Sequence, residues 1–225
     1  MHTPLLANIV VQFFLKGGPV MWPILVSSFV AVAVVGERAF WWLREGQKRD
    51  PKKLEQVLMS LENGDVASAA GISDKSEDPV IRMIHHGLEH VNTSMQGALQ
   101  LAAGIELERA GRFLTMMDTL VTLAPLLGLL GTVTGLMRAF LNVGSAELSV
   151  MAVTGGIGEA LIATACGLGI AIFCLIPFNY FTGKVVRLQF ELETAATNVE
   201  VMVNAVNGGA AALAKQPAKT ETVHH

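Results

Sequence analysis

The sequence contains little charge. Only 16% of its 225 residues are Asp, Glu, Lys or Arg, whereas 52% are hydrophobic and the mean hydropathy is +0.49. Soluble domains carry about 25% charged residues, so this composition indicates a membrane protein. The net charge of −3 and the pI near 6.1 provide no excess of positive charge, which argues against binding to nucleic acid.

Cysteine is equally scarce, because the chain has only Cys166 and Cys174. They lie eight residues apart in one apolar stretch, and a helix would separate them by about 12 Å along its axis. A disulfide requires Cα atoms within about 7 Å of each other, so the two cannot pair within that helix. We interpret both as packing residues and predict neither a metal nor a redox role for them.

Catalytic and nucleotide-binding motifs are missing as well. The sequence has no P-loop, no Gly-x-Gly-x-x-Gly and no Gly-x-Ser-x-Gly, and no nucleophile is matched with a base. We therefore predict that the protein is not an enzyme and needs no cofactor. Residues 1–15 lack the basic start and the cleavage site of a signal peptide, so none is expected. We assign no role to His224 and His225, which resemble the remnant of an affinity tag.

Long apolar runs are what the sequence does contain. Residues 17–36 and 119–137 are uncharged, and residues 148–183 hold a single formal charge. The hydrocarbon core of a bilayer is about 30 Å thick and is crossed by about 20 helical residues. The sequence therefore predicts an all-α integral membrane protein with three transmembrane helices, at 17–43, 113–141 and 148–183.

The basic residues predict how these helices are oriented. Residues 43–112 contain nine Lys and Arg, whereas Lys16 precedes the first span and Arg138 lies near the later hairpin. Basic loops remain in the cytoplasm, so we predict a short periplasmic N-terminus at 1–16 and a cytoplasmic loop after the first span. Three spans then place the C-terminus in the cytoplasm.

Residues 44–112 are predicted to form a helical cytoplasmic region. The pairs Asp50-Pro51 and Asp78-Pro79 each combine an N-cap residue with proline at the first helical position. Two helix starts are therefore expected at these pairs.

The second and third spans are predicted to extend far beyond the membrane. A helical pattern that begins near Thr93 runs into the second span without a strong break, and the pattern of the third span continues through 184–207. The two spans are joined by a periplasmic turn at 142–147. We expect 208–225, which is rich in Gly, Ala and Lys, to be a disordered tail.

Three histidines in the cytoplasmic region, His85, His86 and His90, raise the question of a metal site. His86 and His90 share one face of a helix. We find no third ligand or carboxylate at a recognisable spacing, and so we predict no metal site.

Small residues form one side of each of the last two spans. Such stripes let membrane helices approach closely, and we predict that they pack helices or line a pore. The stripes consist of Gly128, Gly131 and Gly135 in the second span and Gly156, Ala160, Ala163 and Gly167 in the third.

Glu159 is the single charge of the third span. A carboxylate inside a membrane helix costs roughly 2.5–3.5 kcal/mol on insertion scales and is a functional candidate by default. Counting from a turn at Gly144 places Thr132 within about 5 Å of its depth and Thr164 about 7.5 Å deeper. We predict that Glu159, Thr132 and Thr164 form a proton pathway. The alternative is a structural role, in which a protonated Glu159 only hydrogen-bonds a neighbouring helix.

The chain resembles the proton-channel subunits ExbB and TolQ, and more distantly the four-span stator protein MotA. The resemblance is carried by residues 124–135, APLLGLLGTVTG, and residues 158–168, GEALIATACGL. The number of spans and the long cytoplasmic helices agree with it. Two positions depart from the pattern: Thr134 stands where a tryptophan is common, and Phe173 stands where the family often has proline.

The resemblance implies a ring of five copies in the bacterial inner membrane, whose second and third spans line a pore. The pore would hold a one-span partner like ExbD or TolR with a membrane aspartate, and proton flow would drive motion that is passed to a protein like TonB or TolA. The pore residues of the family fall on Thr132, Glu159 and Thr164. We expect an ExbB-like role in TonB-dependent outer-membrane transport, with a TolQ-like role in envelope maintenance or a non-conducting scaffold as alternatives.

Overall fold

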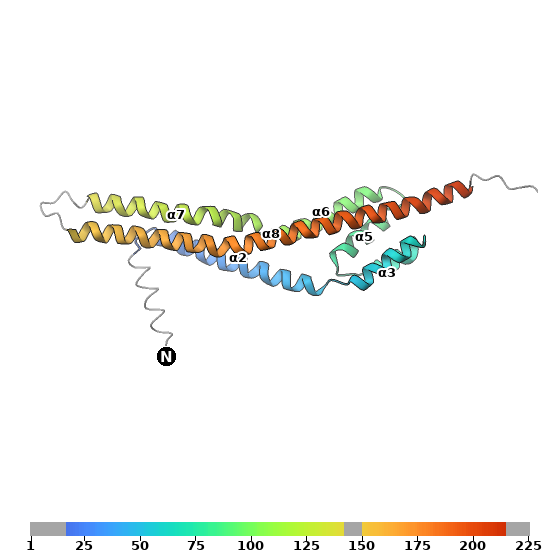
Figure 1. The fold of residues 1–225 in the computed structure, drawn as a ribbon, viewed down its shortest axis with the longest axis horizontal. Coiled ribbons are helices and arrows are strands. Elements are labelled where there is room, and N and C mark those ends of the chain that lie inside the picture. The colour runs from blue at the N-terminus through green and yellow to red at the C-terminus, as the bar shows by residue number, and fades with distance from the viewer. Residues whose placement is uncertain (1–16, 142–149, 215–225) are drawn as a thin grey trace, which may run out of the picture. The chain divides into compact units, whose positions relative to one another are not determined.

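The computed structural model describes residues 17–141 and 150–214, with side chains placed for 17–141 and 154–206. Within these residues all regular structure is helical (Figure 1). The expected periplasmic N-terminus at 1–16 and turn at 142–147 lie outside the described residues. The helices are α2 (Met21–Gln47), α3 (Pro51–Glu62), α4 (Val66–Ser73), α5 (Pro79–Glu89), α6 (Met95–Gly111), α7 (Leu114–Leu141) and α8 (Val150–Ala214).

The described residues form two compact units, to which α2 and α8 both contribute. One unit comprises 17–42, 112–141 and 150–183, and the other comprises 43–111 and 184–214. Among the described residues, three helical segments are long and apolar enough to cross a membrane, over Met21–Gln47, Met95–Leu141 and Thr154–Val206. The predicted class, an all-α membrane protein with three spans, is confirmed.

The first unit packs α2 against α7 and α8 through small, purely apolar clusters. In one cluster Ala31 of α2 contacts Leu120 of α7 and Cys174 of α8, and all three are buried. Many large apolar side chains remain on the outside of this unit, among them Phe29 and Ile176, each 69% exposed. An apolar exterior is what a lipid environment requires.

Arg38 is a buried charged residue in this apolar unit, with a side chain that is only 1% exposed. Its Nε atom lies 2.6 Å from a carboxylate oxygen of Glu37, and its guanidinium lies 5.0 Å from the centre of the Trp41 ring. An ion pair and a cation–π contact together compensate for burial of the charge.

The helix predicted to run from near Thr93 into the second span is interrupted, so this prediction is wrong at one point. Phe113 has a φ of 63°, and it separates α6 from α7. Left-handed backbone is strained for a non-glycine residue. The Phe113 ring packs beside Met117 and Phe181, and the guanidinium groups of Arg38 and Arg112 lie 5.6 and 4.8 Å from it. These contacts stabilise the break.

In the second unit, both predicted helix starts are confirmed. Asp50 accepts a hydrogen bond from the Lys53 amide at 3.0 Å, and Asp78 accepts one from the Val80 amide at 2.8 Å. A further helix, α4, was not predicted. It begins at an N-cap without proline, Asp65, which accepts from the amide of Ser68 at 2.8 Å.

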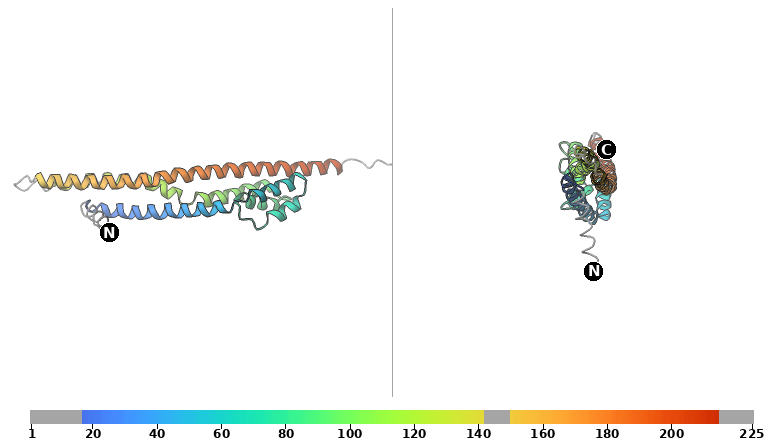
Figure 2. Two further views of the ribbon diagram at one scale, coloured as in Figure 1. Left: turned by 60° about the horizontal axis from the view of Figure 1, so that its bottom comes forward. Right: turned by 90° about the vertical axis from the view of Figure 1, so that its left-hand side faces the viewer.

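The long helix α8 is continuous, as its uninterrupted course from yellow to red in Figure 2 shows. In the second unit its buried side chains, Leu188, Leu192 and Val199, recur at helical spacing. The helix continues through 208–214, which we expected to belong to a disordered tail. The remainder of that tail, 215–225, lies outside the described residues.

Candidate functional site

The interface between α7 and α8 is built where glycines allow two backbones to touch. A Cβ added at Gly128 would lie 2.9 Å from the Cα of Thr164, and one added at Gly135 would lie 3.0 Å from the carbonyl oxygen of Gly156. A Cβ cannot be accommodated at such distances unless the helices separate. Both positions therefore require glycine, because only glycine leaves room for backbone at this spacing.

The other small residues meet across the same interface. A Cβ at Gly131 would overlap Ala163, one at Gly156 would lie 2.7 Å from the Cβ of Ala139, and Ala160 contacts Gly135. A Cβ at Gly167 would overlap the carbonyl oxygen of Ala124. The stripes are thus occupied by contacts within one chain, and a role in lining a pore stays a prediction for them.

Glu159 forms an ion pair with a residue that the sequence analysis did not assign to the site. Arg138 Nη2 on α7 lies 2.9 Å from Glu159 Oε1 on α8. The two side chains are 44% and 22% exposed, respectively. Gly18, just before α2, has a φ of +71°, and a Cβ there would overlap the Glu159 carboxyl group. The Glu159 carboxylate therefore lies between Arg138 and Gly18, and a side chain at position 18 would collide with it.

The register of the hairpin explains why Arg138 was missed. The pairs Gly128–Thr164 and Gly131–Ala163 have midpoints at positions 146 and 147, two to three residues beyond the assumed turn at Gly144. Counted from Gly144, Arg138 and Glu159 differ by nine residues of helix, about 13.5 Å. Counted from the observed midpoints they differ by about four residues, or 6 Å, and a long arginine side chain spans this distance.

The two predicted threonines have different partners. The Thr164 hydroxyl donates to the carbonyl oxygen of Gly128 at 3.0 Å, across the α7–α8 interface, and lies 3.3 Å from that of Ala160 in its own helix. The Thr132 hydroxyl donates to the carbonyl oxygen of Leu129 at 2.7 Å, one turn back in α7. Thr164 thus joins the two helices, whereas Thr132 is satisfied by its own helix.

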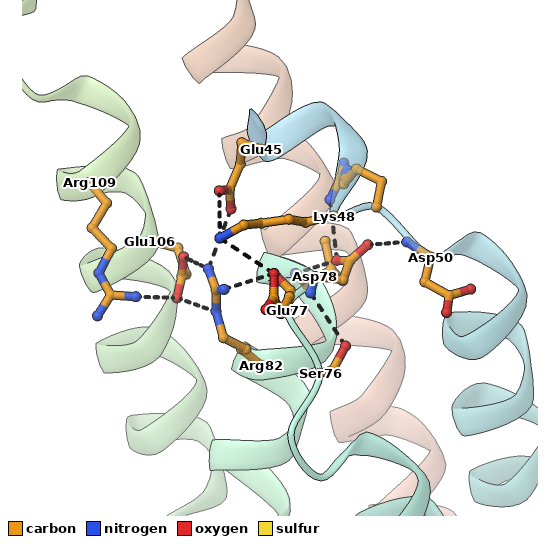
Figure 3. Close-up of polar contacts among 11 residues, drawn as sticks. Glu45, Lys48, Asp50, Ser76, Glu77, Asp78, Arg82, Glu106 and Arg109 are labelled. Carbon is orange, nitrogen blue, oxygen red and sulfur yellow. Dashed lines mark hydrogen bonds and ion pairs between the residues drawn. The ribbon is translucent and has the colours of Figure 1, made fainter. Parts of the chain in front are cut away.

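A second polar cluster lies in the other unit and was not predicted. Arg82 of α5 donates to both carboxylate oxygens of Glu106 on α6, at 3.1 and 2.6 Å, and its Nη2 lies 3.4 Å from Glu45 near the end of α2 (Figure 3). Burial alone would lower the pKa of Arg82, but the hydrogen bond and charge of Glu106, with those of Glu45, outweigh burial and raise it. The cluster ties three helices together.

The expectation that no carboxylate accompanies the histidines of α5 is wrong. One potential ligand atom from each of His86, Glu89 and His90 lies within 4.8 Å of the other two. His85 is not part of this group, and its Nδ1 lies 3.0 Å from the Ser73 hydroxyl. Glu89 lies three residues after His86 and directly before His90.

These observations define a helical membrane protein in which two closely packed spanning helices hold an ion pair between them. Residues 75–194, which include both helices at this pair, match the MotA/TolQ/ExbB proton channel family. With more than half of its length matched, the chain belongs to this family. The predicted likeness to ExbB and TolQ is confirmed.

Individual relatives agree with the family assignment. An ExbB-like biopolymer transport protein of Synechocystis sp., ExbB-like 3, is 36% identical over 184 residues, which cover 79% of this chain and 87% of the relative. ExbB-like 1 of the same organism is 38% identical over 174 residues, or 74% and 68% of the two chains. The biopolymer transport protein ExbB of Neisseria gonorrhoeae is 38% identical over 89 residues, or 39% and 40%.

Proposed function

We propose that the protein is the proton-channel subunit of an inner-membrane motor driven by the proton-motive force. Three spans, membership of a proton channel family and a carboxylate within the third span support this function. The observation that carries it is the position of Glu159, which faces Arg138 across two helices packed too closely for ordinary side chains.

In this proposal Glu159 is the group that takes up and releases the proton. A proton that binds Glu159 neutralises the carboxylate that pairs with Arg138, so it must weaken that ion pair. Each proton that crosses the field gains about 2.3 kcal/mol per 100 mV, enough to offset such a rearrangement. Thr164 and Thr132 continue the pathway through water, since each hydroxyl can both donate and accept.

We propose further that the working form is a homo-oligomer, a pentamer by family resemblance, that encloses a one-span partner of the ExbD or TolR type. The exterior of α8 supports contacts with other chains. Among the described residues, no atom lies within 4 Å of a Cβ added at Gly155, Gly158 or Gly169, so these glycines do not face α7. Small residues on an open face of a spanning helix favour close approach by another helix.

The proposed setting is the bacterial inner membrane, with the N-terminus in the periplasm and the C-terminus in the cytoplasm. The nine basic residues within 43–112 support this orientation. The names of the ExbB relatives favour energising TonB-dependent outer-membrane transport, through a TonB-like protein, over a TolQ-like role in envelope maintenance.

Replacing Glu159 with Gln tests the function in cells that depend on this chain, because it preserves shape and removes the titrating proton. We expect energised transport to be lost while the protein still inserts and assembles. A non-conducting scaffold would retain its activity. Glu108→Gln, the same change on an exposed part of α6, is the matched control.

Co-purification of a one-span protein with a membrane aspartate is expected, and its absence would contradict the motor.

A further inference from the structure

The last turn of α5 gathers three metal-ligating side chains on one face. His86 and His90 are one helical turn apart, and their ring centres lie 4.8 Å from each other. Glu89 lies between them in the sequence, three residues after His86. A ligand atom of each of the three residues lies within 4.8 Å of the others. The cluster belongs to the second unit and takes no part in the proton site.

The hydrogen bond of His90 prepares its ring for ligation. Its Nδ1 lies 2.9 Å from the carbonyl oxygen of His86. A carbonyl oxygen only accepts, so Nδ1 carries the hydrogen and Nε2 keeps its lone pair. Histidines that bind metals commonly donate their other ring nitrogen to a backbone carbonyl or a carboxylate in this way, which fixes the tautomer and the orientation of the ring.

Glu89 supplies an accessible carboxylate beside the rings of His85 and His86. Its Oε2 lies 3.6 Å from His86 Nδ1, and its Oε1 lies 3.5 Å from His85 Nε2. The Glu89 side chain is 53% exposed and that of His86 is 38% exposed. An ion can therefore reach the cluster, and the side chains have room to rotate toward it.

We propose that His86, Glu89 and His90 bind one divalent transition-metal ion, zinc in the first place, with water completing the coordination. Two imidazole nitrogens and one carboxylate oxygen suit zinc, copper and nickel, whereas magnesium and calcium prefer oxygen alone. Tetrahedral zinc with bonds of about 2.0–2.1 Å brings its ligand atoms to about 3.3 Å from one another. In the structure the ligand atoms lie within 4.8 Å of one another, and rotation of the exposed side chains can bring them to the shorter distance that zinc requires.

The position of the cluster also favours a cation. The residues occupy the C-terminal end of α5, where His90 is the C-cap. The helix dipole leaves partial negative charge at this end, which attracts positive charge within the last turn. Two histidines at positions i and i+4 of a helix lie on one face and can bind the same zinc ion.

Zinc titration of the full-length protein in detergent, stripped with a chelator beforehand, tests the proposal. All variants carry His224→Ala and His225→Ala, so that the terminal histidines do not contribute. We expect one zinc ion per chain. His86→Ala and His90→Gln should each lower the affinity at least about tenfold, since loss of even a supporting group costs about 10- to 100-fold. Glu55→Gln, which changes an exposed carboxylate of α3 outside the cluster, is the control and should keep the stoichiometry and affinity.

Cobalt spectroscopy identifies the donors independently, because a thiolate ligand gives an intense charge-transfer band that imidazole and carboxylate do not. We expect the cobalt-loaded protein to lack this band. The band would assign the ion to Cys166 or Cys174 and overturn the proposal. Equal zinc affinity in His86→Ala, His90→Gln and the control, in protein with unchanged helical circular dichroism, would overturn it as well.

Discussion

Arg138 Nη2 and Glu159 Oε1 lie 2.9 Å apart and join the two spans that carry the family's characteristic segments. The pair gives the membrane carboxylate a countercharge from its own chain. From the sequence alone, the small residues of these two spans are predicted to pack helices or line a pore. The structure fills the small-residue side of α8 with α7 and leaves Gly155 and Gly158 on the open side.

The ion pair predicts energetic coupling between Arg138 and Glu159. In a double-mutant cycle with Arg138→Ala and Glu159→Ala, we expect a favourable coupling energy of about 1 kcal/mol, because both side chains are partly exposed and screening weakens the pair. Thermal unfolding in detergent measures it. A cycle between Glu159 and Arg187, whose contact is with Glu191, is the control and should give no coupling. Zero coupling for Arg138 as well would contradict the observed pair.

The α7–α8 interface predicts that substitution by alanine changes the stability differently at Gly128 and at Gly169. Gly128→Ala places a Cβ against the backbone of Thr164, and we expect it to destabilise the chain by about 1–3 kcal/mol. Gly169→Ala meets open space and should be neutral or stabilising by up to about 1 kcal/mol, since alanine favours helix. Thermal unfolding in detergent compares them, and equal effects would contradict the interface.

Substitution of Gly158 is expected to distinguish packing within the chain from packing between chains. Among the residues that the structure describes, none has an atom within 4 Å of a Cβ added at this position. Gly158→Ala should therefore leave the thermal stability of the dissociated chain unchanged or slightly raised, since alanine favours helix, and should weaken assembly, as measured by the oligomer distribution in native mass spectrometry. If assembly is unaffected, the open face of α8 near Glu159 does not contact another chain.

The break at Phe113 predicts an unusual order of stabilities. Within a helix, glycine is about 1 kcal/mol less favourable than alanine. At a φ of 63° the order reverses, because left-handed backbone costs a non-glycine residue about 1–2 kcal/mol. We expect Phe113→Gly to unfold at a higher temperature than Phe113→Ala, although both lose the packing of the ring. The ordinary order would show that α6 and α7 are continuous.

The cluster around Arg82 predicts a large loss of stability on removal of one charge. Arg82→Met removes the guanidinium that buried Glu45 and Glu106 share, but Lys48 still lies 3.7 Å from Glu45 and Arg109 still lies 3.2 Å from Glu106. We therefore expect a loss of about 1.5–3 kcal/mol, the contribution of hydrogen bonds to a charged group. Arg187→Met removes a largely exposed charge paired with Glu191 and should cost about 0.5 kcal/mol or less. Chemical unfolding followed by circular dichroism compares the two, and similar losses would contradict a structural role for the cluster.

Those features that depend on composition and local signals were predictable from the sequence. Three apolar runs gave the spans, and Asp50 and Asp78 gave two helix starts, because an N-cap acts within its own turn. The break at Phe113 was not predictable, because contacts with distant residues such as Arg38 and Phe181 stabilise it.

The candidate site was predictable only in part for a similar reason. Glu159 could be identified from the sequence alone, because it is the single charge in a long apolar run. Its partner depends on the register of the hairpin, where an error of two to three residues moved Arg138 out of reach. Glu89, in contrast to Arg138, could have been predicted from the sequence, because its spacing from His86 and His90 is visible there.

Proton flux through the reconstituted protein tests the central claim most directly. The complex with its co-purifying one-span protein is placed in proteoliposomes under a potential, and uptake is followed with an internal pH dye for the wild type, Glu159→Gln and the control Glu108→Gln. We predict flux in the wild type and the control and none in Glu159→Gln. Equal flux in all three, with the same oligomer in each, would contradict a proton pathway through Glu159.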